Sequence, residues 1–467
     1  MTARLTFDRL AVALLFLATL AAACLMPAQN DSWWHLRVGQ EIWRLRSPLY
    51  VDTFSYTASG AVWRNHEWLT QLGLYAIYSA GGMPLLTFSA ALLATLAWAL
   101  SWLLMTGPAR WRVALVGMAL PASAVQWSVR PHLVTLCFMP LVMWCFLRGR
   151  RGWLPLLFMV WANLHAGFMA GLVIVAAAAA VTVLQDRSQW RALTSLVVLS
   201  ILATFVNPLG VTAWTTVFES VARSASIGIS EFRAAALLAP SDWPFWILAA
   251  LLAALSVRQA SRMTDWSNPN LPLIATALVL LPTAIRYSRN IPLFLLLAVP
   301  AISQLLSMQD LARAPVRARR ERGAQNLAFL VVVVVLAGGT VGYAWQVPAG
   351  RLHWQPMSAA AIDAVAECPG QVYNRYDDGG YLIWFVPSRP VFVDSRQDPY
   401  PIDFLEEHLR TENSGEYSRL FSSYGIHCAF LPPESPTARN LRRAGWITAY
   451  QDRQWIVLRD RDSRRSD

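Results

Sequence analysis

The most constraining feature of this chain is a succession of long apolar segments separated by short polar connections. A membrane-spanning helix needs about 20 apolar residues, or fewer where local packing allows. Of the 467 residues only 14% are charged, against roughly 25% in soluble proteins. The sequence therefore predicts a mainly α, polytopic helical membrane protein. Eleven spans are expected, near residues 9–27, 84–105, 113–129, 132–147, 153–165, 168–184, 192–206, 242–257, 271–286, 290–306 and 327–346.

The distribution of arginine predicts the orientation of these spans. All 39 basic residues are arginine, and every second connection is rich in them, as in "GPARWR", "RGRRG", "QDRSQWR" and "RAPVRARRER". Under the positive-inside rule these connections, with Arg4 and Arg9, face the cytoplasm. We expect a retained first span, a cytoplasmic N-terminus, a location in the cytoplasmic (inner) membrane and an extracytoplasmic tail.

Net charge does not indicate a nucleic-acid partner. Residues 1–346 hold 25 arginines and 12 acids, a net of +13, whereas residues 347–467 hold 14 arginines and 16 acids, a net of −2. The excess belongs to the membrane part, where it acts as a topology signal. We expect the lipid bilayer, and no nucleic acid, as a partner.

Three segments are expected to lie at the outer face without crossing the membrane. Residues 66–82 and 207–222 are apolar enough to tempt a span assignment, but counting 66–82 would reverse the arginine alternation. We interpret both as interfacial or re-entrant helices. Residues 32–46 predict an amphipathic helix on the outer leaflet, with Trp34, Val38, Ile42 and Leu45 on one stripe and Arg37, Gln40, Glu41 and Arg44 opposite.

The domain division expected is a transmembrane domain over 1–346 and a small extracytoplasmic α/β domain over 347–467. Apolar runs at 381–386, 390–394, 427–433 and 454–460 predict strands, and helices are expected near 357–366, 402–410 and 435–444. Cys368 and Cys428 lie in this tail, where they could form a disulfide if it is outside the cytoplasm, or remain two buried thiols.

Polar side chains gather at the predicted outer ends of the spans. Asp31 follows the first span, either as a helix cap or as a general base. Transfer of a sugar from a phosphate leaving group needs one base on the acceptor and cations on the phosphate. Guanidinium groups match phosphate oxygens, although lipid headgroups would also attract them. The candidate catalytic acids are Asp31, Glu67 and Glu231, and the candidate substrate-binding residues are His66, Arg130, His132, His165, Arg286, Tyr287 and Arg289.

The stretches "NDSWWHLRVGQEI" and "VDTFSYTASGAVWRNHEWLTQLGLYAIYSAGG", with the short spans after them, resemble the C-type (GT-C) membrane glycosyltransferases. That superfamily includes protein O-mannosyltransferases, lipid A aminoarabinose transferases and oligosaccharyltransferases. The resemblance implies a polyprenyl-linked sugar donor, an acceptor in the cell envelope, and Asp31 as the acid of the first outer loop. The second outer loop, "SVRPHL", offers Arg130 and His132 where many members have an acid. This departure indicates either a metal-independent reaction or a fold reused for another purpose.

In the tail, "YDDGGYLIW" followed by "VDSR" resembles the "WWDYG" region of oligosaccharyltransferases, which helps to hold an acceptor peptide. The resemblance implies acceptor-binding roles for Asp377, Asp378, Tyr381, Asp394 and Arg396. The alternative is turn chemistry, because Asp-Gly-Gly suits a tight bend.

The alternative functions are a transporter or flippase, and a non-catalytic envelope assembly protein on the same scaffold. A transporter usually places ionisable groups near the bilayer midplane. Here the polar residues gather at span ends, which favours a glycosyltransferase. No cofactor is expected, with a divalent metal left open.

Overall fold

The computed structural model describes residues 5–228, 232–262, 268–308, 322–346 and 352–461. Two compact units are present. The first consists of Met1–Met26, Met83–Val211 and Ile229–Val347, and the second of Pro27–Gly82, Thr212–Gly228 and Pro348–Asp467. The domain boundary expected after residue 346 remains a prediction, and the second unit adds residues 27–82 and 212–228 to the tail.

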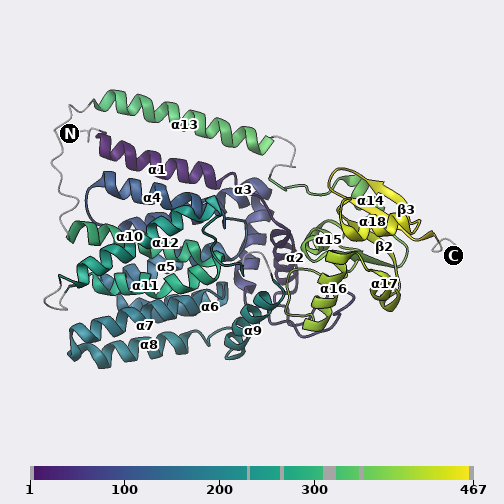
Figure 1. The fold of residues 1–467 in the computed structure, drawn as a ribbon, viewed down its shortest axis with the longest axis horizontal. Helices are drawn as coiled ribbons and strands as arrows, with labels where there is room; N and C mark the ends of the chain where they lie inside the picture. Colours follow the sequence, from purple (N-terminus) through teal and green to yellow (C-terminus); the bar gives the residue numbers. More distant parts are fainter. Residues whose placement is uncertain (1–4, 229–231, 263–267, 309–321, 347–351, 462–467) are drawn as a thin grey trace. The chain divides into compact units, whose positions relative to one another are not determined.

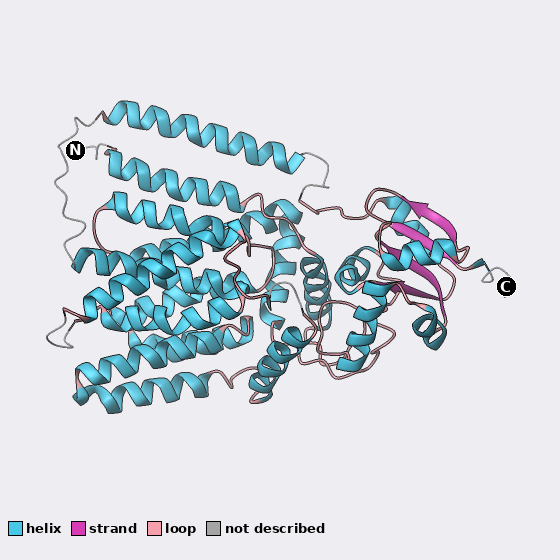
Figure 2. Cartoon of the chain, viewed as in Figure 1, coloured by secondary structure: helices cyan, strands magenta, loops and turns pink. Residues whose placement is uncertain are grey.

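The first unit is a bundle of helices lying side by side (Figure 1), drawn in cyan in Figure 2. Every expected span coincides with a helix, and the predicted mainly α, polytopic fold class is confirmed. The helices are α1 (Phe7–Ala23), the second part of α3 (Trp68–Leu103), α4 (Ala109–Ala124), α5 (His132–Leu147), α6 (Leu154–Leu164), α7 (Phe168–Gln185), α8 (Trp190–Ala203), α10 (Trp243–Ala260), α11 (Leu271–Arg286), α12 (Ile291–Met308) and α13 (Gly323–Gln346).

Helix α3 is continuous in outline but broken in its backbone. Gly81 and Gly82 have non-helical dihedral angles, and Gly82 has a φ of 63° that favours glycine. The break separates residues 68–80, which belong to the second unit, from the expected span that follows. The segment 66–82, expected to be a separate helix, is therefore distinguished from the span by its glycine pair.

The bundle is organised around α12, which contacts α4, α5, α10 and α11. Nearly all of its side chains from Ile291 to Leu305 are buried. Helix α13 is the opposite case: it packs along α1 and buries none of its side chains. Its exposed valines, leucines and phenylalanine would be a large apolar patch in water, so lipid is the environment that suits this helix. By length and composition, five helices of the described residues are candidate membrane spans.

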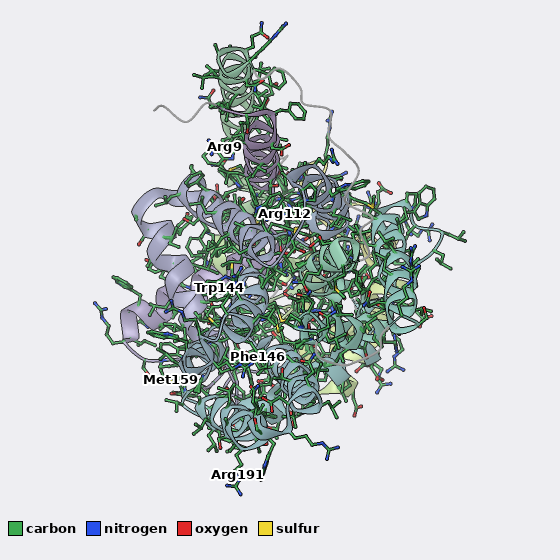
Figure 3. All side chains as sticks on the ribbon, turned by 90° about the vertical axis from the view of Figure 1, so that its left-hand side faces the viewer. Arg9, Arg112, Trp144, Phe146, Met159 and Arg191 are labelled. Carbon is green, nitrogen blue, oxygen red and sulfur yellow. A yellow bond between two sulfur atoms is a disulfide. The ribbon has the colours of Figure 1, made fainter. Side chains whose placement is uncertain are left out.

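Arginines of the predicted cytoplasmic connections lie at one end of this bundle. Figure 3 faces that end and labels Arg9, Arg112 and Arg191, from α1, α4 and α8. The guanidinium of Arg112 stacks over Trp102, 3.8 Å from the ring centroid. Gathering at one end is what the alternation predicts, while the leaflet that this end faces remains a prediction. The segment "RAPVRARRER" lies outside the described residues except for Arg322.

The second unit is built on a four-stranded sheet, drawn in magenta in Figure 2. The strand order is β1 (Gln371–Asn374), β2 (Ile426–Leu431), β4 (Ile456–Arg459) and β3 (Ile447–Gln451), with β1 parallel to β2 and the other pairs antiparallel. Its helices are α2 (Asn30–Leu45), the first part of α3, α9 (Thr212–Ser226), α14 (Ala359–Ala366), α15 (Gly379–Phe385), α16 (Ile402–Ser414), α17 (Ser418–Tyr424) and α18 (Pro436–Arg443).

The predictions for the tail were right for its helices and for two strands. Helices α14, α16 and α18 and strands β2 and β4 lie where expected. The strand predicted at 381–386 was wrong, since these residues belong largely to α15. The strand predicted at 390–394 was also wrong: Val391 makes one isolated bridge, to Ser55. An apolar run of five or six residues does not distinguish a buried strand from a buried helix.

Helix α2 is confirmed, but its apolar stripe does not face lipid. Trp34, Val38 and Ile42 are buried in a core that includes Val372 of β1 and Phe430 of β2. Leu45, at the end of the stripe, remains 48% exposed. Helix α9 is held to the same unit by a hydrogen bond, which Arg223 donates to the Tyr400 carbonyl at 2.6 Å. The apolar stripe of α2 is thus part of the unit's own core.

Cys368 and Cys428 form a disulfide, which selects between the two alternatives for this pair. The bond joins the end of α14 to strand β2, closing a loop of 60 residues. Disulfides persist in oxidising compartments, which accords with the predicted extracytoplasmic tail.

Thiol counting tests this bond. Cys24, Cys137 and Cys145 are free, so alkylation of the denatured chain should modify three thiols, and all five cysteines only after reduction. Replacing both bonded cysteines, as Cys368→Ser/Cys428→Ser, should destabilise the second unit by about 4 kcal/mol in thermal or chemical denaturation, because the unfolded chain loses its constraint. Cys24→Ser/Cys145→Ser is the matched control. Five alkylated thiols without reduction would contradict the assignment.

Candidate functional site

Asp31 lies in the first turn of α2, and it is not the helix cap. Gln29 is the N-cap residue, and it forms a capping box with Ser32. The carboxylate of Asp31 is half-buried, and its Oδ1 accepts hydrogen bonds from the Ser395 hydroxyl and from Trp34 Nε1, the latter at 3.3 Å. The cap interpretation of Asp31 is therefore wrong, and the side chain is held by the tail.

The direction of the Ser395 hydrogen bond follows from its other partners. Its Oγ accepts from Asn30 Nδ2 at 3.0 Å and from Trp34 Nε1 at 3.1 Å. A serine hydroxyl has two lone pairs and one proton. With both lone pairs engaged, the proton is directed at Asp31. Ser395 was missed by sequence analysis because its partner lies 364 residues away in the chain.

The loop carrying Ser395 is anchored by a buried ion cluster. Nη2 of Arg396 lies 2.7 Å from Asp52 Oδ1 and 2.7 Å from Asp394 Oδ2, and all three side chains are essentially inaccessible. Tyr400 donates its hydroxyl to the same oxygen of Asp394 at 2.7 Å. The ion cluster thus fixes the backbone on both sides of Ser395. The acceptor contact expected of Asp394 and Arg396 remains a prediction.

Two glycines bring α15 against the start of α2. A Cβ on Gly380 would lie 2.2 Å from the Asn30 carbonyl oxygen, and one on Gly379 would lie 2.2 Å from that of Val393. The Gly380 N–H donates to Asn30 Oδ1 at 2.6 Å. The turn interpretation of Asp-Gly-Gly is therefore wrong: Gly379 is helical, and the glycines permit close packing beside Asp31. Tyr381, expected at an acceptor site, packs against Trp455, with ring centroids 5.8 Å apart.

Asp378 is a buried acid with an unusual ionisation. Its side chain is 6% exposed, and its Oδ2 has no hydrogen-bond partner among the described residues. Burial raises the pKa of this carboxyl to about 8; Glu412 and the exposed Asp377 add to the rise, and Arg375 opposes it. Glu412 itself is held ionised, since hydrogen bonding to His408 lowers its pKa against the effect of burial. At neutral pH, Asp378 is thus largely protonated.

Glu67 and His66 belong to a second polar group around His35. Glu67 lies 3.8 Å from His35 Nε2 and 3.9 Å from His66 Nε2. Gln71 accepts a hydrogen bond from Asn65 at 2.7 Å, so its amide nitrogen faces His35 Nδ1 at 3.2 Å as the donor. The neutral His35 ring then carries its proton on Nε2, toward Glu67. His35 was missed, although it follows Asp31 by four residues and therefore shares its helix face.

In the first unit, Arg130, His132 and His165 gather near the N-terminal end of α5. Arg130 donates to Ser128 Oγ at 2.8 Å, and His132 Nε2 lies 2.8 Å from the Gln126 carbonyl oxygen. Nδ1 of His165 lies 2.8 Å from Thr135 Oγ1, one turn into α5, and accepts from the Gly167 N–H at 3.0 Å. This contact fixes Nδ1 as the acceptor nitrogen, so a neutral His165 carries its proton on Nε2.

Arg286, Tyr287 and Arg289 form a stacked cluster where α11 meets α12. The Arg286 guanidinium lies 4.9 Å from the Tyr287 ring centroid, and that of Arg289 lies 4.7 Å from Phe232. Phe232 and Tyr287 meet edge to face at 5.4 Å. Stacking on a ring engages the face of a guanidinium group and restricts its orientation. The sequence did not indicate Phe232, because its contacts with this loop form only when the chain is folded. Glu231, the remaining candidate, lies outside the described residues.

The described residues contain no group of three or more His, Cys, Asp or Glu side chains arranged to hold a metal ion. The second unit contains a half-buried carboxylate, Asp31, oriented by the tail, and the first unit contains guanidinium groups stacked on aromatic rings.

Solved structures of other proteins have folds similar to that of this chain. The archaeal oligosaccharyltransferase AglB from Archaeoglobus fulgidus, in complex with an inhibitory peptide and a dolichol-phosphate, is 12% identical with a TM-score of 0.51, over 91% of this chain and 69% of that one. Its apo form gives 10% identity and a TM-score of 0.54, over 90% and 69%. ArnT from Cupriavidus metallidurans gives 14% and 0.50, over 95% and 96%.

This chain has the C-type glycosyltransferase fold. The resemblance seen in the sequence is thereby confirmed at the level of the fold, over most of the chain. No protein-family model and no curated protein matches the sequence. At identities of 10–14% the likeness shows the fold alone. The roles of individual residues are therefore inferred from the chemistry and geometry of their side chains.

Asp378→Asn tests the buried acid. An unfolded aspartate loses its proton near pH 3.8, whereas the folded one keeps it up to about pH 8, so this group makes the protein less stable as pH rises between these values. Asparagine has no proton to lose. The stability of Asp378→Asn relative to wild type should therefore rise from pH 5 to pH 8, by up to roughly 4 kcal/mol. Thermal denaturation at three pH values measures this, with Asp377→Asn as the exposed control. Parallel curves would refute the assignment.

Proposed function

We propose that this protein is a membrane glycosyltransferase that moves a sugar from a polyprenyl-phosphate carrier to an acceptor hydroxyl on the outer face of the membrane. The observation that carries the proposal is Asp31 at the start of α2, oriented by Ser395 and Trp34 within a C-type glycosyltransferase fold. The protein would lie in the inner membrane of the cell envelope, with its N-terminus in the cytoplasm and the C-terminal unit outside.

In the proposed reaction, the acceptor oxygen attacks the anomeric carbon and the bond from that carbon to the phosphate oxygen breaks. The acceptor proton passes to the carboxylate of Asp31, and the electron pair leaves with the lipid phosphate. A phosphate departs without prior protonation, so one base suffices, whereas hydrolysis of a glycoside uses two facing carboxyl groups. Glu67, with His66, and Glu231 are the alternative acids.

Arg286 and Arg289 are proposed to stabilise the departing phosphate. The stacking of their guanidinium groups on Tyr287 and Phe232 restricts their motion and orients them. Preorganised cations placed where charge develops are a large source of rate acceleration. Arg130, His132 and His165 are proposed to line the same donor-binding region. Asp377 and Asp378 are proposed as acceptor contacts.

Replacing the proposed base should abolish transfer. Membranes containing Asp31→Asn should transfer radiolabelled sugar from a panel of polyprenyl-phosphate hexoses at least about 100-fold more slowly than wild type, because asparagine cannot take a proton. Ser395→Ala should slow transfer less, since the base remains but loses its orientation, and Ser395→Thr should restore much of it. Glu41→Gln, on the same helix, is the control. Equal transfer by Asp31→Asn and wild type would remove Asp31 from the chemistry.

Replacing Arg286 or Arg289, the residues proposed to stabilise the departing phosphate, should lower the rate of transfer. Arg286→Gln and Arg289→Gln should each lower kcat/KM by about 10- to 1,000-fold, since a stacked neutral amide supplies less charge stabilisation. Lysine at either position should recover only part of the loss, because it lacks the planar fork. Arg233→Gln is a neighbouring control that reports effects on stability, because the Arg233 guanidinium donates to Asp242 at 2.8 Å. Full recovery with lysine would indicate a role for charge alone.

A further inference from the structure

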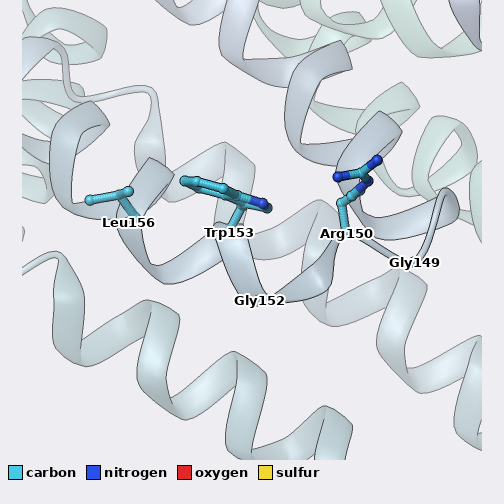
Figure 4. A pocket seen from close by; sticks show the side chains of 5 residues that line it. All are labelled: Gly149, Arg150, Gly152, Trp153 and Leu156. Carbon is cyan, nitrogen blue, oxygen red and sulfur yellow. The ribbon is translucent and has the colours of Figure 1, made fainter.

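The connection between α5 and α6 forms a shallow depression that the glycosyltransferase proposal does not use. It has a volume of about 480 Å³ and is lined by Gly149, Arg150, Gly152, Trp153 and Leu156 (Figure 4). Gly149 has a φ of 71°, the left-handed region that glycine tolerates best, and the chain reverses there. A Cβ on either glycine would meet nothing within 4 Å, so the depression is open on this side.

The charge of this connection is only partly neutralised. Arg151 stacks over Phe146 at 4.6 Å and donates to Gln189 at 2.9 Å. Arg148 and Arg150 are exposed, and neither makes an ion pair or a side-chain hydrogen bond with any residue that the structure describes. Two adjacent guanidinium groups with open donor edges match the oxygens of a phosphate group.

An apolar strip continues from the depression along α6. Trp153, Leu156 and Val160 are 57%, 45% and 36% exposed. Their spacing of three and four residues places them on one face of the helix. In Figure 4 the side chains of Arg150, Trp153 and Leu156 follow one another in that order, with the indole nitrogen on the side toward Arg150. The surface therefore passes from cationic to amphipathic to apolar over a short path.

We propose that this strip, from Arg148 to Val160, binds an anionic phospholipid. The phosphate would lie against Arg148 and Arg150, the Trp153 indole would occupy the level between headgroup and hydrocarbon, and an acyl chain would follow Leu156 and Val160. Tryptophan and arginine at this level of a membrane are typical of such contacts. A free phosphate would use the cations without the strip, and a zwitterionic lipid would gain less from them.

The test is native mass spectrometry of the full chain in detergent, titrated with phosphatidylglycerol or with phosphatidylcholine of the same acyl chains. Wild type should bind phosphatidylglycerol about tenfold more tightly than phosphatidylcholine, and Arg148→Gln/Arg150→Gln should remove about that factor. Trp153→Ala should weaken both lipids, and Trp153→Phe should weaken them less. Inorganic phosphate should not compete.

The matched control is Arg258→Gln/Arg262→Gln, which removes the same charge from another arginine-bearing region, at the C-terminal end of α10. It should leave phosphatidylglycerol binding unchanged. Equal weakening by the two double variants would overturn the proposal in favour of diffuse charge attraction. No weakening by Arg148→Gln/Arg150→Gln, or competition by inorganic phosphate, would overturn it as well. Because all of these side chains are exposed, unchanged thermal denaturation should accompany each variant.

Discussion

The second unit depends on one buried cation. Arg396 is removed from water and is compensated by Asp52, from the segment between α1 and α3, and by Asp394, its neighbour in the tail. Its guanidinium also lies 5.1 Å from the Phe54 ring and 4.7 Å from Trp63. Leaving such a charge without either carboxylate would be strongly destabilising. The ion cluster therefore joins two distant parts of the chain, and it fixes the backbone between Asp394 and Arg396, where Ser395 reaches Asp31.

Much of the bundle could be predicted from the sequence because its constraint is local. A segment that lies in lipid must satisfy its own backbone hydrogen bonds and must be long enough to cross, and both requirements can be read from a run of apolar residues. The ends of α5 and α11 lie where the sequence placed them, within a residue. The separation of residues 66–82 from the following span was inferred from the arginine alternation, and in the structure the backbone breaks at Gly81 and Gly82.

The second unit was less predictable because its contacts are distant in sequence. The stripe of α2 has the pattern of a membrane-surface helix, and only the tail's core reveals what covers it. The run "YLIWF" has the composition of a strand but belongs to α15, whose first residues Gly379 and Gly380 approach other backbone segments closely. Asp31 was identified from its place after the first span. Its partner Ser395 is an ordinary residue type with no local signal, and only the folded chain brings Ser395 against Asp31 and the adjacent Asn30.

Because the chain has no lysine, arginine supplies the basic side chains of both units. A guanidinium group can stack on an aromatic ring and still donate from its edge, which an ammonium group does less well. In the buried site of Arg396 both properties are used at once, by two rings and two carboxylates. At Arg286 and Arg289 the guanidinium groups lie over the Tyr287 and Phe232 rings. The same stacking that contributes to a closed ion cluster in one unit thus orients two guanidinium groups in the other.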